Sequence, residues 1–386
     1  MIAPAFGSAG AFRLAGPDCT VTGSGVREHL DPRLAHGPGA AGAALAMVRR
    51  VEAETGRRSI VVGAIGFDPY RPARLWVPDE FTHDQPVRRT RRALSGAAEV
   101  PDDPRYRDAV GAALERIEAG ELSKVVLARA VDVRTRTAVD QTALYEVLAA
   151  ANPAAYAFGV DLGEHGTMLG ASPELLVRVD GRSVVSTPLA GSAPRGVDRD
   201  DDLRARNGLA RSAKDLREHG IVVDQVDAAL GPLTSTLEVP AAPSLSATEQ
   251  LWHLSTTLSG RLRPGVTALD AAYALHPTPA VCGHPGIAAS RLIGELEGTD
   301  RGFFAGLIGW MDAEGNGEWV LALRCGLVRD DEVRVHAGAG VVADSTAAGE
   351  HAETATKLQT FLRSLVTVAG EVETEPAADT LAVSGA

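Results

Sequence analysis

Residues 102–135 read DDPRYRDAVGAALERIEAGELSKVVLARAVDVRT, and this stretch contains both kinds of secondary structure on which the fold depends. Its first part has the cap and the apolar spacing of an amphipathic helix. Gly120 is a typical helix stop, and the apolar run that follows is typical of a strand. The stretch therefore predicts a helix that leads into a strand, with Lys124 at the junction.

Outward from this stretch, the predicted strands come in runs and do not alternate regularly with helices. Further helices are expected at 142–153, from about residue 203 to 230, and around Glu350. Strands are expected at 59–67, 73–78, 156–162, 166–181, 183–192, 254–262, 304–312, 318–328 and 332–342. Runs of strands favour an α+β fold over a doubly wound α/β sheet.

The composition excludes several classes of protein. With 386 residues, 45% hydrophobic residues and a net charge of -12, the chain can bury a sizeable core but is poorly suited to binding nucleic acid. We interpret the basic run RRTRR at 88–92 as a solvated loop. No apolar run approaches the ~18 residues that a membrane span needs, and the N-terminus lacks the pattern of a signal peptide.

The three cysteines, Cys19, Cys282 and Cys325, are too few and too scattered for a disulfide framework or a zinc ribbon. A reducing compartment is therefore the natural expectation, and the sequence predicts a cytoplasmic protein.

Two acidic pairs have the same spacing on predicted helices. Asp215 and Glu218 lie in KDLREH, and Glu350 and Glu353 lie in GEHAETATKL. Two facing pairs could hold Mg²⁺, with direct ligands from Glu218 and Glu353 and water-mediated ones from Asp215 and Glu350. Most acidic pairs with this spacing only face water, so a solvated surface remains the alternative.

Three charged residues interrupt apolar runs, namely Lys124, Glu174 and Arg324. Burial lowers the pKa of a lysine and raises that of a carboxyl group, which makes Lys124 a candidate general base and Glu174 a candidate general acid. The planar guanidinium of Arg324 suits a carboxylate. Exposure at a strand edge is the alternative for each residue.

Two further segments invite a cofactor or metal interpretation. GAGVVA at 338–343 matches a dinucleotide-binding fingerprint, but it follows no βαβ start, so we interpret it as a glycine loop that faces an anion. HPTPAVCGHPG at 276–286 offers His276, Cys282 and His284, yet the spacing matches no familiar ligand set. Its prolines favour a rigid loop that shapes a pocket wall.

Taken together, these motifs resemble those of the chorismate-utilising enzymes, and within them the isochorismate synthases of the siderophore type. The resemblance covers about residues 100–365, and it rests on ten motifs in order: KVVLARA, GASPELLVR, TPLAGSAPRG, KDLREH, LWHLST, HPTPAVCG, DRGFFAGLIGW, GEWVLALRC, HAGAGVVADS and GEHAETATKL.

The resemblance implies one large α+β domain with a layered, antiparallel-rich sheet core flanked by helices. Residues 1–100 would be its variable N-terminal part, and 101–367 would be the chorismate-binding catalytic core. The last residues, 368–386, have the composition of a disordered end.

The same resemblance implies roles for individual residues. Lys124 matches the base that activates water for attack at C2 of chorismate, and Glu174 matches the acid that protonates the departing C4 hydroxyl. The other matches are Glu218 and Glu353 as Mg²⁺ ligands, Asp215 and Glu350 as their supports, Arg324, Gly338, Gly340 and Lys357 as carboxylate-binding groups, and Gly191 and His253 as pocket residues near the ring.

Smaller features separate the branches of this family. Ammonia-using relatives generally lack a lysine at position 124, and Ala190 stands where one of them has a nucleophilic lysine, so no glutamine amidotransferase subunit is expected. Salicylate synthases typically have Thr and Tyr in place of Ala280 and Phe304. Leu323, by contrast, resembles the residue of the salicylate synthases more than that of the isochorismate synthases. We therefore expect a monomeric isochorismate synthase that supplies 2,3-dihydroxybenzoate or salicylate.

Three alternatives remain open at this point. One is a salicylate synthase, which would also eliminate pyruvate, and another is a synthase of the menaquinone pathway. The third is a non-catalytic chorismate-binding subunit, although such a protein would not need Lys124, Glu174 and both acidic pairs.

Overall fold

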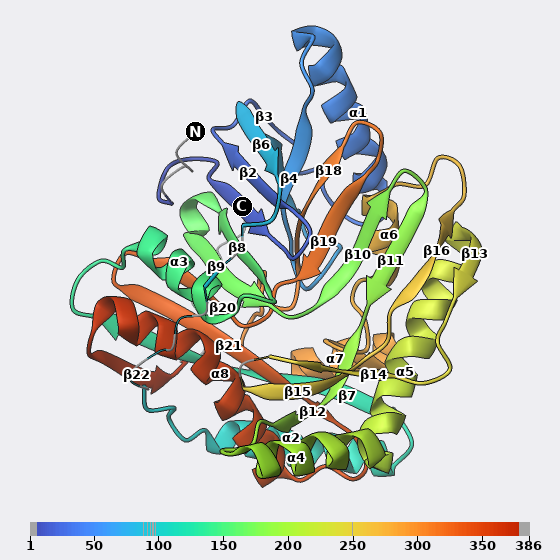
Figure 1. The fold of residues 1–386 in the computed structure, drawn as a ribbon. Coiled ribbons are helices and arrows are strands. Elements are labelled where there is room, and N and C mark those ends of the chain that lie inside the picture. The colour runs from blue at the N-terminus through green and yellow to red at the C-terminus, as the bar shows by residue number, and fades with distance from the viewer. Residues whose placement is uncertain are drawn as a thin grey trace.

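The computed structural model describes residues 6–377 apart from 88, 91, 93, 95, 97 and 249. A ten-stranded antiparallel sheet forms one layer (Figure 1). Its order is β17 (Gly283–His284), β7 (Lys124–Thr135), β21 (Glu332–Val341), β20 (Cys325–Arg329), β9 (Thr167–Ser172), β8 (Tyr156–Asp161), β1 (Phe12–Ala15), β2 (Thr20–Ser24) and β6 (Glu80–Asp84), and β22 (Val372–Pro376) also pairs with β7.

A nine-stranded antiparallel sheet forms the second layer. Its order is β13 (Thr234–Glu238), β16 (Leu258–Leu262), β11 (Ser183–Thr187), β10 (Leu175–Asp180), β19 (Gly317–Leu321), β18 (Leu307–Asp312), β4 (Ile60–Ile65), β5 (Arg74–Val77) and β3 (Glu28–His29). A smaller sheet contains β12 (Leu189–Pro194), β15 (Leu251–Ser255) and β14 (Ser244–Ala247). The α+β prediction is confirmed.

The largest apolar cluster contains side chains from both large sheets, including Phe12 and Leu14 of the first and Val62 and Ile308 of the second. Helices cover the sheets on their outer faces. They are α1 (Gly39–Thr55), α2 (Pro104–Glu118), α3 (Gln141–Ala151), α4 (Arg199–Arg211), α5 (Ala213–Leu230), α6 (Ala268–Leu275), α7 (Gly286–Leu296) and α8 (Ala347–Ala369).

The helix and strand predicted at 102–135 are confirmed as α2 and β7. The Asp103 side chain accepts a hydrogen bond from the backbone N–H of Tyr106 and caps α2, and Pro104 occupies the first turn, where no N–H is needed. Gly120 follows the helix with φ +76°, which an L side chain rarely adopts. The chain can then turn directly into β7.

Five predictions of continuous elements are wrong. Three are the strands expected at 166–181, 183–192 and 254–262, which are divided into β9 and β10, β11 and β12, and β15 and β16. The long helix expected up to residue 230 is two helices, because Ser212 is extended and its hydroxyl caps α5 by accepting from the N–H of Asp215. The strand expected at 318–328 is divided into β19 and β20, and Arg324 lies between them with φ +51°. Arg324 therefore lies at a turn, outside any strand.

The glycine loop expected at 338–343 is also wrong, because Gly338 and Gly340 lie inside β21 and pair with Ala128 and Val126 of β7. The disordered end expected at 368–386 is wrong for β22, whose residues 372–376 complete the hydrogen bonds of residues 131–135 of β7. Residues 378–386 lie outside the described residues, as do Arg88 and Arg91 of the basic run.

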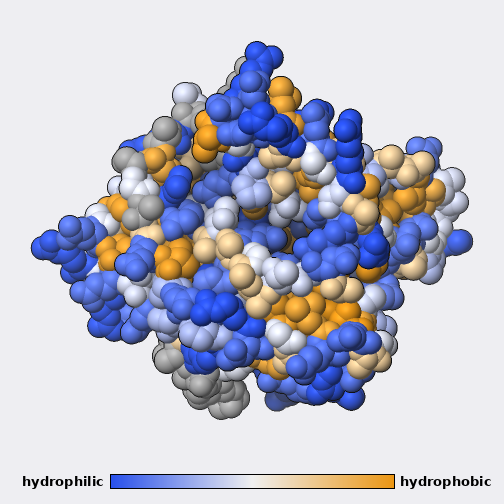
Figure 2. Space-filling view, turned by 90° about the horizontal axis from the view of Figure 1, so that it is seen from below, coloured by the Kyte–Doolittle hydropathy of each residue, from blue (hydrophilic) through white to orange (hydrophobic). Residues whose placement is uncertain are grey.

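None of the helices in the described part of the chain has the length and apolar character to cross a membrane. Figure 2 shows one face of the molecule, which is covered mainly by hydrophilic residues with separate hydrophobic areas between them.

Candidate active site

A pocket of about 680 Å³, its open mouth included, lies between β7 and β21 of the ten-stranded sheet, β12 and β15 of the small sheet, and the residues that join β9 to β10 and β19 to β20. Most of the residues predicted for the site line this pocket. They are Glu174, Gly191, Glu218, His253, Ala280, Phe304, Leu323, Arg324, Gly338, Gly340, Glu353 and Lys357.

Lys124 lies directly behind the pocket wall, with only 1% of its side chain exposed, so exposure at a strand edge is excluded. Its Nζ lies 2.9 Å from Oε1 of Glu218, which reaches it from α5. Gly340 makes room for this pair, because a Cβ there would lie 2.5 Å from the Glu218 Oε1 and 3.1 Å from the Lys124 Cε. The sequence analysis placed Gly340 at the site, but it did not indicate this steric requirement for glycine.

Glu174 lies between β9 and β10 and is buried, with 4% of the residue exposed. Its Oε1 accepts a hydrogen bond from the backbone N–H of Leu189 at 3.2 Å. Burial raises the pKa of Glu174 to about 8, although the Leu189 hydrogen bond and the charges of Lys124 and Arg324 act in the opposite direction. Glu174 is therefore mostly protonated at pH 7 and can donate a proton.

Two positive side chains lie at the same pocket. Burial lowers the pKa of Arg324 to about 10, which leaves the guanidinium charged at pH 7. Lys357 Nζ donates to the carbonyl of Gly338 at 2.9 Å and lies 2.6 Å from Oε1 of Glu353. Together they give the pocket the charge that a carboxylate ligand requires.

His253 and Gly191 lie at the pocket on neighbouring strands of the small sheet. Burial lowers the pKa of His253 to about 3, so its imidazole is neutral, and its Nε2 has no hydrogen-bond partner among the described residues. Gly191 has φ +78°, and a Cβ there would lie 2.9 Å from the Cβ of Asp215. The glycine thus lets β12 approach α5 closely.

The two acidic pairs lie on α5 and α8. Glu350 Oε1 accepts from Lys214 Nζ at 3.2 Å, and Glu353 accepts from the Ser192 hydroxyl at 3.2 Å. Burial, the charge of Glu218 on the same helix and that of Glu353 on α8 raise the pKa of Asp215. The side chains of Glu218 and Glu350 are only 12% and 3% exposed, so a solvated surface does not explain the pairs.

A cation would relieve the repulsion among these carboxylates, and the oxygen donors suit Mg²⁺. No three His, Cys, Asp or Glu side chains of the described residues lie close enough to form a metal site by themselves. The arrangement instead fits an ion held by one or two carboxylates with the substrate supplying further ligands, as is usual for Mg²⁺.

The segment 276–286 forms part of the wall, as predicted, because Ala280 and Val281 line the pocket. The Nε2 atom of His276 lies 3.0 Å from the carbonyl oxygen of Gly66 and 3.1 Å from that of Phe67. His276 thus anchors the wall to the strand layer, and its position does not support the metal interpretation.

Residues 76–366 match the family described as Chorismate binding enzyme. The chain belongs to this family. The resemblance drawn from the sequence motifs is therefore confirmed.

Several chorismate-binding enzymes are similar to this chain over most of its length. The isochorismate synthase DhbC of Bacillus subtilis is 41% identical, covering 92% of this chain and 94% of the relative. The isochorismate synthase EntC of Escherichia coli K12 is 41% identical, covering 79% of this chain and 81% of the relative.

Solved structures agree with this family assignment. A Bacillus anthracis DhbC structure, described as an isochorismate synthase specific for 2,3-dihydroxybenzoate, is 39% identical with a TM-score of 0.88 and covers 93% of this chain and 96% of its own. Anthranilate synthase component I of Streptococcus pneumoniae has a TM-score of 0.69 at 21% identity, which shows the shared fold alone.

The sequence did not single out Ser192 and Arg301, which also line the pocket. Ser192 follows Gly191 directly, but nothing in its neighbours indicated a bond to Glu353. Arg301 lies in the short segment TDRGFF before β18, where a charged residue looks like part of an exposed turn. Arg301 is 5% exposed, and this burial could be recognised only from the folded structure.

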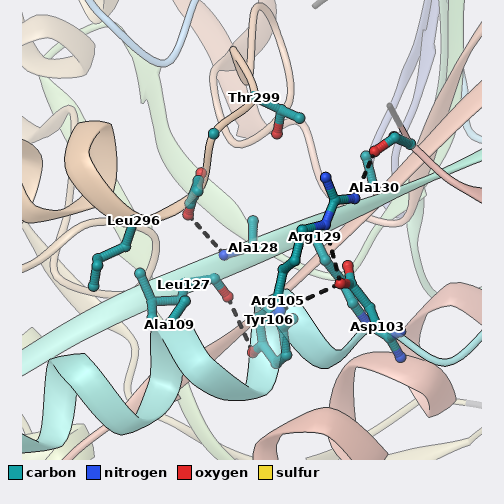
Figure 3. A pocket seen from close by; sticks show the side chains of 13 residues that line it. Asp103, Arg105, Tyr106, Ala109, Leu127, Ala128, Arg129, Ala130, Leu296 and Thr299 are labelled. Carbon is teal, nitrogen blue, oxygen red and sulfur yellow. Dashed lines mark hydrogen bonds and ion pairs between the residues drawn. The ribbon is translucent and has the colours of Figure 1, made fainter. Parts of the chain in front are cut away.

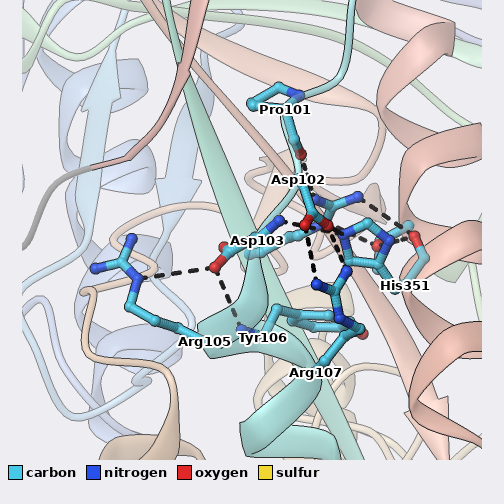
Figure 4. Close-up of polar contacts among 9 residues, drawn as sticks. Pro101, Asp102, Asp103, Arg105, Tyr106, Arg107 and His351 are labelled. Carbon is cyan, nitrogen blue, oxygen red and sulfur yellow. Dashed lines mark hydrogen bonds and ion pairs between the residues drawn. The ribbon is translucent and has the colours of Figure 1, made fainter.

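A second pocket, here called the α2 pocket, lies between α2, β7 and the end of α7, and none of the predicted catalytic residues lines it (Figure 3). The Tyr106 hydroxyl donates to the carbonyl of Leu127 at 3.3 Å. At the start of α2, the Asp103 N–H donates to Nε2 of His351 at 3.3 Å, which ties α2 to α8 (Figure 4). These hydrogen bonds join α2 to β7 and α8, and we assign them a structural role.

Proposed function

We propose that this protein is an isochorismate synthase, which converts chorismate to isochorismate. The observation that carries the proposal is a pocket lined by buried Glu174 and the positive side chains of Arg324 and Lys357, with buried Lys124 behind its wall, paired with the lining residue Glu218. The names of the similar DhbC and EntC proteins support it.

In the proposed reaction, Lys124 removes a proton from water as the water oxygen bonds to C2 of chorismate. Both conjugated double bonds of the ring shift, from C1=C2 to C1=C6 and from C5=C6 to C4=C5, as the C4–O bond breaks, and Glu174 donates its proton to the departing hydroxyl. One water enters and one water leaves, so the reaction is an isomerisation. General acid–base catalysis of this kind contributes about 10²–10⁴-fold to a rate.

The remaining charged groups would orient the substrate. Chorismate carries two carboxylates, and Arg324 and Lys357 are placed to bind them. Glu218 and Glu353 would hold Mg²⁺, with Asp215 and Glu350 in support, and the ion would supply countercharge for a substrate carboxylate. The neutral His253, with its unbonded Nε2, would offer one further polar contact to the ring substituents.

We infer that the product supplies 2,3-dihydroxybenzoate, as the description of the similar Bacillus anthracis DhbC structure suggests. Pyruvate elimination, as in salicylate synthases, is the second candidate activity, because Leu323 lines the pocket. Ala280 and Phe304 argue against it, since neither offers the hydroxyl group of the Thr and Tyr expected in a lyase. We also propose a cytoplasmic monomer, in keeping with the three unpaired cysteines.

A chromatographic product assay tests this proposal. Purified protein is incubated with chorismate and Mg²⁺, with and without EDTA and ammonium, and isochorismate, salicylate, pyruvate and anthranilate are quantified. We expect isochorismate without stoichiometric pyruvate, a loss of turnover in EDTA and no anthranilate with ammonium. Salicylate with equal pyruvate would replace the proposal with the lyase activity, and turnover that is unaffected by EDTA would remove Mg²⁺ from it.

A further inference from the structure

The buried pair of Arg301 and Glu297 connects the pocket to the surrounding sheet. Only 3% of the Arg301 side chain and 2% of the Glu297 side chain are exposed. Arg301 Nε donates to Oε2 of Glu297 at 2.8 Å, and one terminal nitrogen also bonds to Oε1. The planar guanidinium and the carboxylate thus form a bidentate pair.

The guanidinium also bonds to two backbone carbonyls in different walls of the pocket. One terminal nitrogen, Nη1, donates to the carbonyl of Val281 at 2.7 Å, next to Ala280. The other, Nη2, donates at 2.7 Å to the carbonyl of Val126, two residues after Lys124 on β7. A single side chain therefore fixes the strand that carries the general base against the wall that contains Ala280.

The pair holds two further parts of the structure. The backbone carbonyl of Arg301 accepts from the N–H of Phe304 at 2.8 Å, and Phe304 lines the pocket. Glu297 Oε1 accepts from the N–H of Ala128 at 2.7 Å, the contact drawn at Ala128 in Figure 3. Glu297 lines the α2 pocket whereas Arg301 lines the active-site pocket, so the pair joins the two.

Arg301 is poorly placed to bind a substrate carboxylate, although it reaches the pocket. Four hydrogen bonds to Glu297, Val281 and Val126 occupy four of its five N–H donors. Its guanidinium carbon also lies 4.2 Å from the centroid of the Phe67 ring. The Arg301 side chain therefore contacts protein groups on several sides.

We propose that Arg301 is a positioning residue, which sets the placement of Lys124 relative to the pocket walls formed by Ala280 and Phe304. This inference rests on the proposed synthase function and adds a residue to it. A misplacement of about 1 Å in a catalytic group can cost about 10²-fold in rate, so the geometry of these contacts affects catalysis more than binding. Substrate affinity depends on Arg324 and Lys357, which Arg301 does not contact in the described structure.

The substitution Arg301→Lys tests the role, because lysine keeps the charge but lacks the planar fork that reaches both carbonyls and Glu297 at once. We expect kcat to fall at least tenfold while KM changes less than threefold, measured below the unfolding temperature of every variant. Arg334→Lys is the matched control. Arg334 forms a similar pair with Asp132 between β21 and β7, with Nε to Oδ1 at 2.6 Å, but outside the pocket.

Glu297→Gln is a milder variant that keeps an acceptor for the Ala128 N–H and would answer the question if Arg301→Lys does not fold. We expect a decrease in kcat of about threefold with KM unchanged. Normal kcat in a folded Arg301→Lys, or an equal loss in Arg334→Lys, would overturn the positioning role. Absence of isochorismate formation by the wild-type protein would instead overturn the proposed function.

Discussion

Two buried glutamates, one at each pocket, have opposite surroundings. Glu174 at the active-site pocket accepts a backbone hydrogen bond from Leu189, and burial raises its pKa to about 8. Glu297 at the α2 pocket accepts from Ala128 and is paired with Arg301. The first carboxyl group is able to hold a proton at neutral pH, whereas the second forms two hydrogen bonds with a guanidinium.

This difference shows that the partners of a buried carboxyl group decide whether it can take part in proton transfer or only stabilises the fold. A charged partner with well-formed hydrogen bonds fixes a buried carboxylate and makes it part of the structure. A buried carboxyl group with few donors keeps its proton and can transfer it when a substrate arrives. The comparison implies that substitutions at Glu174 and Lys124 should change turnover, while those at the pair of Glu297 and Arg301 should act through geometry.

The largest effect is expected for Lys124→Ala. Because this change removes the general base, we expect kcat to fall by about 10²–10⁴-fold, while the dissociation constant for chorismate changes little. Turnover is measured by isochorismate formation and binding by calorimetry. Arg134→Ala is a suitable control, since Arg134 lies at the exposed end of the same strand and pairs with Glu332. Unchanged turnover in Lys124→Ala would remove the base from the mechanism.

A smaller decrease, of about 10²-fold in kcat, is expected for Glu174→Gln, because glutamine keeps the shape but cannot donate the proton. Glu174 must be protonated to act, so the wild-type kcat should fall as the pH rises through about 8. A profile of kcat between pH 6 and 10 measures this. The high-pH decrease should disappear in Glu174→Gln and persist in Glu297→Gln, and the reverse result would contradict the comparison.

The sequence predicted much of the fold because local signals agreed with the tertiary structure. The Asp103 cap and Gly120 defined α2 and the start of β7. Prediction was wrong where a single residue changes the direction of the chain. Ser212 caps a new helix although its neighbours favour a continuous one, and Arg324 adopts a left-handed conformation inside an apolar run.

The residues of the site could be predicted more completely than the hydrogen bonds that hold them in position. Glu174 and Arg324 were indicated by charges that stood out in apolar runs, whereas Gly191, His253 and other lining residues were indicated only by the family resemblance. Arg301 gave no such signal, since its partners are the backbone carbonyls of Val126 and Val281, which any sequence has. The same applies to Gly338 and Gly340, whose pattern suggested a loop while the register with β7 placed them in a strand.

A third buried glutamate tests whether burial without hydrogen bonds is enough to make a carboxyl group catalytic. Glu318 on β19 is 1% exposed, and neither of its carboxyl oxygens has a hydrogen-bond partner among the described residues. It does not line the active-site pocket. Burial raises its pKa from 4.5 to about 7, and Arg178, with Nη1 3.8 Å from Oε2, acts in the opposite direction. We therefore expect Glu318→Gln to leave kcat unchanged.

The substitution Glu318→Gln should instead change how the free energy of unfolding depends on pH. Because the folded-state pKa is higher than the unfolded one, the unfolded state loses its proton first, and the free energy of unfolding falls as the pH rises from 4.5 to 7. At 1.36 kcal/mol per pKa unit, this loss is about 2–3 kcal/mol. Denaturant unfolding at pH 5 and pH 8 should show that Glu318→Gln removes the decrease. A lower kcat in this variant would mean that a buried carboxyl group without hydrogen bonds affects the reaction from outside the pocket, and the comparison would fail.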